Sequence, residues 1–225
     1  MHIPDGYLGP QTYGSLFVVM TPIWVRAYNF LKNKLKSAHV PLLALSAAFS
    51  FVIMMFNIPI PGGTTGHAVG AVLIAILLGP WSATLVISIV LIIQALIFGD
   101  GGITAIGANC FNMAFVMPFV GYYLYKLIKG KSPFPSKRAL ISAGISAYIA
   151  LNVSAFFTAL ELGLQPIIAK SPTGAPLYCP YPLSVTIPAM LIEHLLVFGW
   201  VEAIVTVGVL SYLIKSNIIK EWEYA

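Results

Sequence analysis

Long apolar stretches, separated by short polar or glycine- and proline-rich segments, make up most of this chain. Between Ser37 and Gly99 there is no Asp, Glu, Lys or Arg. One membrane crossing needs about 20 apolar residues, so this stretch is long enough for several crossings. The pattern predicts an all-α integral membrane bundle of about seven transmembrane helices. The expected crossings lie near residues 11–31, 40–57, 67–79, 81–98, 107–128, 138–162 and 184–214.

Basic residues fall almost entirely on one side of this expected topology. Those that follow the first, fifth and seventh crossings are Lys32, Lys34, Lys36, Lys126, Lys129, Lys131, Lys137, Arg138, Lys215 and Lys220. The opposite loops contain only Lys170. Cytoplasmic loops are enriched in Lys and Arg. The bias therefore predicts an outer N-terminus and a cytoplasmic C-terminus.

The composition agrees with a membrane location. The 225 residues are 59% hydrophobic and 8% charged, whereas soluble domains carry about 25% charged residues. The net charge of +5 then comes from lysines beside a bilayer, and nucleic acid is not an expected partner. We predict one membrane domain over 1–225, with an N-terminal segment at 1–10 that folds into the bundle, transmembrane helices over 11–214 and a cytoplasmic tail at 215–225.

The first residues have no signal-peptide pattern, because no basic region precedes an apolar run. They are expected to persist in the mature protein. A free N-terminus with His2 at the second position is a chelator: the Met1 amine, the His2 amide nitrogen and its imidazole Nδ1 can hold one ion in fused rings. Only strongly Lewis-acidic ions such as Ni²⁺ and Cu²⁺ displace an amide proton, and they favour square-planar nitrogen sites. The alternative is that His2 is incidental.

His67 is the natural candidate for a fourth nitrogen. It follows a proline- and glycine-rich loop on the predicted outer face, where the backbone can approach other groups closely. A helix-capping or interfacial histidine is the alternative interpretation. His194 is the next candidate, whereas His39 lies on the predicted cytoplasmic side.

Two motifs carry a resemblance to a known family. The sequences are MHIPDGYL at residues 1–8 and PGGTTGH at residues 61–67. Together they resemble the substrate-capture component of cobalt and nickel energy-coupling-factor transporters, the CbiM/NikM family. The resemblance covers roughly residues 1–215, and residues 4–10 are more similar to the nickel branch.

The resemblance implies a transport component of a prokaryotic plasma membrane that is not itself an enzyme. Its implied ligands are Met1, His2 and His67, and its implied substrate is Ni²⁺, with Co²⁺ as the alternative. The implied partners are a transmembrane coupling subunit, ATPase subunits and a small accessory membrane subunit. In this class, alanine motifs similar to Ala44–Ala48 and Ala139–Ala143–Ala147 contact the coupling subunit, although internal helix packing explains them equally well.

Further polar residues are candidates for a supporting role. Side chains that could orient the imidazoles from the outer side are Asp5, Asn57, Thr65, Asp100 and Asn109. Glu161, Glu193 and Glu202 lie within predicted crossings, where an ionisable group indicates function. Glu193 and Glu202 are nine residues apart, which puts them on nearly opposite helix faces at ~100° per residue.

Two other classes of protein remain open. One is a binding component for an organic solute such as a vitamin, with Tyr7, Tyr13, Tyr178 and Tyr181 lining an apolar pocket. The other is an intramembrane metalloenzyme, which would keep an open coordination position. The sequence contains no P-loop motif and no HExxH motif. Any ATP hydrolysis therefore belongs to another chain.

Overall fold

The computed structural model describes residues 1–34 and 40–216, and almost all of its regular structure is helical. The α-helices are α1 Pro10–Lys34, α2 Val40–Met54, α3 Ala71–Leu78, α4 Pro80–Ile93, α5 Ile106–Asn109, α6 Met117–Lys129, α7 Lys137–Gly163, α8 Gln165–Ile168, α9 Leu183–Glu193 and α10 Gly199–Lys215. Three π-helical segments are η2 Gln94–Phe98, η3 Cys110–Val116 and η4 His194–Phe198. The two-residue strands β1 Ile58–Pro59 and β2 Thr65–Gly66 pair antiparallel.

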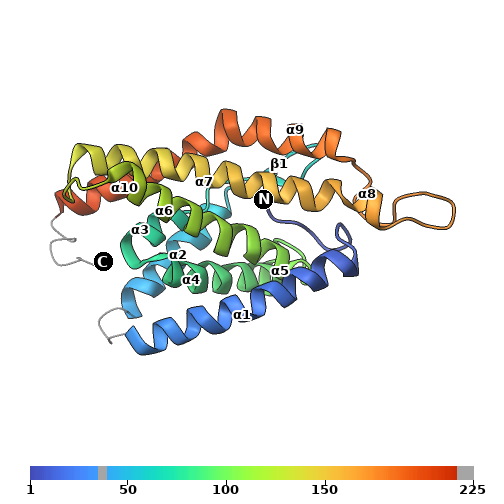
Figure 1. Cartoon of the computed structure of the whole chain (residues 1–225), viewed down its shortest axis with the longest axis horizontal. Coiled ribbons are helices and arrows are strands. Elements are labelled where there is room, and N and C mark those ends of the chain that lie inside the picture. The colour runs from blue at the N-terminus through green and yellow to red at the C-terminus, as the bar shows by residue number, and fades with distance from the viewer. Residues whose placement is uncertain (35–39, 217–225) are drawn as a thin grey trace.

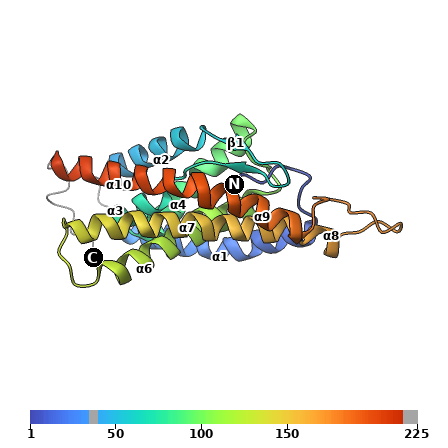
Figure 2. The ribbon, with the colours of Figure 1, turned by 90° about the horizontal axis from the view of Figure 1, so that it is seen from above.

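The long helices run along one common axis as an elongated bundle (Figure 1). Helix α7 spans much of its length and packs against α6, α9 and α10. The loop after α8 extends from one end of the bundle. In both views the N-terminus lies within the bundle and not at an end (Figures 1 and 2). The first residues are therefore enclosed by helices.

Each predicted crossing corresponds to a helical segment, but the third begins later than expected. Helix α3 starts at Ala71 and has only eight residues, so at 1.5 Å per residue it is about 12 Å long and does not span a membrane by itself. Residues 67–70 are irregular. Their apolar character suggested helix, whereas their backbone groups bond to side chains of other helices.

The helical segments suit a lipid environment. Three continuous segments in the described part of the chain are long and apolar enough to cross a membrane: Pro80–Phe98, Lys137–Ile168 and Leu183–Lys215. Large apolar side chains cover the outside, including Val18, Phe56, Ile97, Leu127 and Leu196. Exposed apolar surface of this extent is rare in soluble monomers. The count of seven crossings and the orientation remain predictions.

The alanine motifs divide between the inside and the outside. Ala139, Ala143 and Ala147 are buried within the core, so internal packing explains them. Ala44 and Ala48 on α2 are exposed, and their contact with a coupling subunit remains a prediction. Cys110 and Cys179 are buried free thiols.

Candidate metal-binding site

The N-terminal tripeptide is buried in the bundle. Met1 and Ile3 have no exposed surface, and His2 is 3% exposed. A turn at residues 5–8, with Gly6 at φ 81°, reverses the chain before α1 begins at Pro10. This turn allows the N-terminal tripeptide to fold back into the bundle, as predicted for the segment 1–10.

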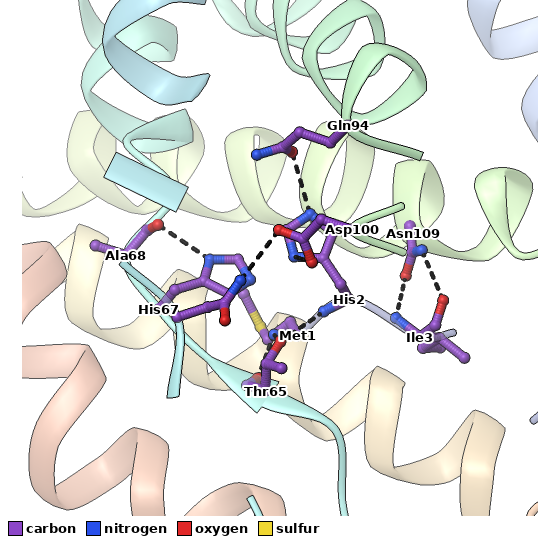
Figure 3. Close-up of polar contacts among 10 residues, drawn as sticks. Met1, His2, Ile3, Thr65, His67, Ala68, Gln94, Asp100 and Asn109 are labelled. Atoms are coloured by element: carbon purple, nitrogen blue, oxygen red, sulfur yellow. Dashed lines mark hydrogen bonds and ion pairs between the residues drawn. The ribbon is translucent and has the colours of Figure 1, made fainter. Parts of the chain in front are cut away.

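Asn109 holds the tripeptide as a neighbouring strand would. The Ile3 N–H donates to Asn109 Oδ1 at 2.8 Å, and Asn109 Nδ2 donates to the Ile3 carbonyl at 3.1 Å (Figure 3). The Gly102 N–H donates to the same carbonyl at 2.8 Å. A Cβ on Gly102 would lie 2.4 Å from the Asp5 nitrogen, so this close approach requires glycine. The backbone of residue 3 is thus fixed on both sides.

Thr65 binds the two main-chain nitrogens that precede Ile3. The Met1 amine donates to the Thr65 carbonyl and, at 3.0 Å, to Thr65 Oγ1. The His2 N–H donates to the same hydroxyl at 3.3 Å. Burial lowers the pKa of the Met1 amine well below its ordinary value, although the charge of Asp100 opposes the shift. A neutral amine uses two N–H groups on Thr65 and keeps a lone pair for a ligand bond.

Gln94 determines which nitrogen of His2 is available. The Gln94 Oε1 atom lies 3.2 Å from His2 Nε2, so Nε2 carries the proton and Nδ1 is bare. No described group hydrogen-bonds to Nδ1, although Asp100 Oδ1 lies 3.5 Å away. Burial lowers the pKa of His2 to about 3. The imidazole is therefore neutral at pH 7, and its contact with Asp100 is not an ion pair.

His67 presents the opposite nitrogen. Its Nδ1 donates to the Ala68 carbonyl at 3.1 Å, which leaves Nε2 bare, and no described group bonds to that atom. The two imidazoles stack, with ring centroids 4.6 Å apart and planes inclined by 28°. Phe198 packs over Gly66, where a Cβ would lie 1.8 Å from the ring. This close packing fixes the backbone beside His67.

The arrangement brings the N-terminal tripeptide and the segment around His67 side by side (Figure 3) and offers four candidate nitrogens. They are the Met1 amine, the His2 amide nitrogen, His2 Nδ1 and His67 Nε2. In the described part of the chain, no three His, Cys, Asp or Glu side chains gather into a metal-type cluster. The candidate set therefore combines the two imidazoles with main-chain nitrogens.

The five predicted supporting residues have different roles. Thr65, Asp100 and Asn109 contact the tripeptide, and Asn57 Nδ2 donates to Asp100 Oδ2 at 3.1 Å. Asp5 instead accepts from the Thr104 N–H at 2.8 Å and from the Ile103 N–H at 3.1 Å, and so it caps a loop.

His194, the next candidate, is buried; its Nδ1 lies 2.7 Å from the Met190 carbonyl, and no described group bonds to its Nε2. His39 lies outside the described residues. Gln94 was not among the candidates from the sequence, although a polar amide within a long apolar stretch was a sign that it could bond to another buried polar group.

The chain has close relatives among known transport proteins. The family model described as the cobalt uptake substrate-specific transmembrane region, CbiM, matches residues 2–218. The chain is 52% identical over 215 residues to a probable fused nickel transport protein of Lactiplantibacillus plantarum, covering 95% of this chain and 64% of that protein. It is also 52% identical to a fused nickel transport protein of Rhodobacter capsulatus, covering 96% of this chain and 62% of that protein. The chain thus spans less than two thirds of both fused proteins.

A solved structure also has a closely similar fold. A crystal structure described as a transition metal transporter superposes with a TM-score of 0.93 at 48% sequence identity, covering 100% of this chain and 98% of that chain. The family and these relatives are described as transport proteins and not as enzymes. The resemblance read from residues 1–8 and 61–67 is confirmed: the chain belongs to the CbiM family of membrane transport proteins.

Proposed function

We propose that this chain is the substrate-binding component of an ATP-driven uptake transporter for Ni²⁺, with Co²⁺ as the alternative ion. It binds the ion on the outer face through the Met1 amine, the His2 amide nitrogen and Nδ1, and His67 Nε2. One observation carries the proposal. The two imidazoles use opposite ring nitrogens for protein hydrogen bonds, and the nitrogens left bare are those that this chelate requires.

The chemistry of the donor set favours a late divalent ion. Ni²⁺ and Cu²⁺ prefer square-planar nitrogen sites, whereas Mg²⁺ and Ca²⁺ prefer oxygen ligands. The site is already prepared for deprotonated ligands, because burial lowers the pKa values of Met1 and His2. The bound ion then displaces one proton, that of the His2 amide. The nickel transport names of the two fused relatives support Ni²⁺ as the substrate.

The contacts of the tyrosines argue against a vitamin pocket. Tyr7 and Tyr13 pack against a small core that includes Ile3 and Leu8, and Tyr178 packs against Gly9. These rings support the N-terminal segment. Four planar nitrogens also fill the coordination square of Ni²⁺, whereas a metalloenzyme keeps an open position.

The expected topology and partners complete the proposal. The chain crosses the cell membrane seven times, with its N-terminus outside, where loops carry Lys170 alone. It has no P-loop, so ATP is hydrolysed by partner ATPase subunits through a transmembrane coupling subunit. A small accessory membrane subunit assists them.

Metal titration of protein with Met1 as its verified first residue tests the proposal. We expect one equivalent of Ni²⁺ to give the yellow absorption of diamagnetic planar nickel. Adding a short peptide before Met1 should abolish this signal, because the amine becomes an amide. His67→Ala should remove the fourth nitrogen, whereas the same peptide placed after Ala225 should change nothing. Full binding by the N-terminally extended protein would refute the ligand assignment.

A further inference from the structure

One peptide group connects His67 to a carboxylate on α10. The carbonyl of Ala68 accepts from His67 Nδ1 at 3.1 Å. The other end of the same peptide, the Val69 N–H, donates to Glu202 Oε2 at 2.7 Å. Glu202 has no exposed surface. The carboxylate and the imidazole are therefore joined through a single amide, although they lie 135 positions apart in the sequence.

Glu202 also holds the next peptide group. The Gly70 N–H lies 3.0 Å from both carboxylate oxygens. Gly70 precedes α3 with a left-handed φ of 75° and receives no cap from a side chain of its own segment. The carboxylate thus binds the two N–H groups that come just before the first helical residue, Ala71, at the helix end where the dipole favours negative charge. On the other side, Ser50 Oγ donates to the Val69 carbonyl at 2.7 Å.

Hydrogen-bond partners of metal-binding histidines fix the tautomer and raise the basicity of the ligand nitrogen. A carbonyl oxygen does this for His67, since it accepts only from a protonated Nδ1. A carboxylate that accepts from the far end of the same peptide polarises the amide and strengthens its carbonyl as an acceptor. The Glu202 carboxylate therefore binds one end of the Ala68–Val69 peptide, the other end of that peptide binds His67 Nδ1, and His67 Nε2 stays without a hydrogen bond.

We propose that Glu202 is a positioning residue for His67, acting through the Ala68–Val69 peptide to keep Nδ1 protonated and Nε2 directed at the ion. The inference rests on the proposed function, since it takes His67 as a ligand. Glu202 itself does not touch the ion. The proposal gives a role to one of the two glutamates in the seventh predicted crossing. Glu193, the other, is exposed.

Glu161 offers a matched control. It is also buried in a long helix, and it accepts from Asn112 Nδ2 at 2.9 Å. None of its hydrogen bonds reaches residues 67–70. A substitution at Glu161 therefore changes a buried carboxylate of the same kind without changing the peptide next to His67.

The test compares Glu202→Gln with Glu161→Gln in the full chain with a free N-terminus. We expect Ni²⁺ affinity to fall roughly 10–100-fold in E202Q and to stay close to wild type in E161Q. Nitrogen NMR of ¹⁵N-histidine protein without metal gives an independent readout, with His67 assigned by its absence in His67→Ala. E202Q should shift the His67 ring away from the pure Nδ1–H tautomer. Unchanged affinity or an unchanged tautomer in E202Q would overturn the proposal.

Glu202→Asp separates positioning from packing. A packing role predicts that Asp, which is shorter, is worse than the nearly isosteric Gln. The relay, meaning the hydrogen bonds from Glu202 through the Ala68–Val69 peptide to His67, predicts that E202D binds Ni²⁺ more tightly than E202Q, because Asp keeps the charge and two acceptor oxygens. If E202Q does not fold, E202D is compared with E161D: weaker Ni²⁺ binding together with a shifted His67 tautomer in E202D alone supports the positioning role, and an unchanged tautomer or equal effects in the two variants overturn it. Failure of the wild-type chain to bind Ni²⁺ would overturn the proposed function, whereas the metal-free tautomer still tests the relay.

Discussion

Replacing Gln94 with leucine removes the group that selects the tautomer of His2. Gln94 has no exposed surface, and its Oε1 is the hydrogen-bond partner of His2 Nε2. In the variant, the ring either keeps a buried Nε2–H without an acceptor or moves the proton to Nδ1. A proton on Nδ1 faces Asp100 Oδ1, 3.5 Å away, and blocks the nitrogen required for the chelate.

The magnitude follows from the cost of the unpaired group. A buried donor left without a partner costs about 1–3 kcal/mol. Metal binding forces the ring into that state, so the cost is subtracted from the binding free energy. At about 1.4 kcal/mol for each factor of ten, Gln94→Leu should weaken Ni²⁺ binding roughly 5- to 150-fold.

Calorimetric or absorbance titration of protein with a verified Met1 measures this effect. Asn152→Leu is the control, because Asn152 is a buried amide whose bond, to the Tyr148 carbonyl at 2.8 Å, is local to α7. Ni²⁺ affinity equal to wild type in Gln94→Leu, with Asn152→Leu also unaffected, would refute the assignment of Nδ1 as the ligand.

Three further predictions concern the same segments. Thr65→Val keeps the shape of the side chain but removes the hydroxyl that accepts from the Met1 amine. Ni²⁺ affinity should fall roughly 2- to 12-fold, as for one lost hydrogen bond of about 0.5–1.5 kcal/mol, and an unchanged titration curve would contradict this role. At pH 7 the protein should release about one proton per Ni²⁺, because the lowered pKa values of Met1 and His2 leave only the amide proton to displace. The free peptide Met-His-Ile, whose amine has an ordinary pKa near 8, should release about two protons. Calorimetry in buffers of different ionisation enthalpy counts the released protons, and a count of two for the protein would show that its amine is charged. Gly66→Ala should destabilise the fold by about 1–3 kcal/mol and abolish Ni²⁺ binding, because its Cβ would lie 1.8 Å from Phe198; thermal unfolding beside Gly14→Ala, which has open space, checks this.

The helices could be predicted from the sequence because apolar runs and their glycine and proline boundaries are local signals. Helices α1, α2 and α7 begin within a residue or so of the expected positions. The start of α3 was wrong because Ala68 and Val69 are apolar, and nothing local indicates that their backbone bonds to Glu202. A distant side chain there outweighs the hydropathy pattern.

The candidate ligands, which remain a proposal, were suggested by a different kind of pattern. A histidine at position two is a chelator only beside a free amine, so this proposal depends on a local motif in the first residues. The supporting groups were harder to identify. Gln94 and Glu202 lie 92 and 135 residues from the histidines that they influence. Only the packing of η2 and α10 around the site brings them close. The prediction that Glu193 and Glu202 lie on different faces is confirmed, since one is exposed and the other is buried.

The hydrogen bonds that Asn109 and Gly102 make to Ile3 have a consequence for the affinity of the site for its ion. These hydrogen bonds connect two parts of the same chain and do not involve the ion, so they form when the chain folds. Fixing a backbone residue costs about 1–2 kcal/mol of conformational entropy, or about 3–6 kcal/mol for residues 1–3. Because that ordering precedes the encounter with the ion, the preorganised tripeptide should gain roughly two to four orders of magnitude in affinity over a floating chain end.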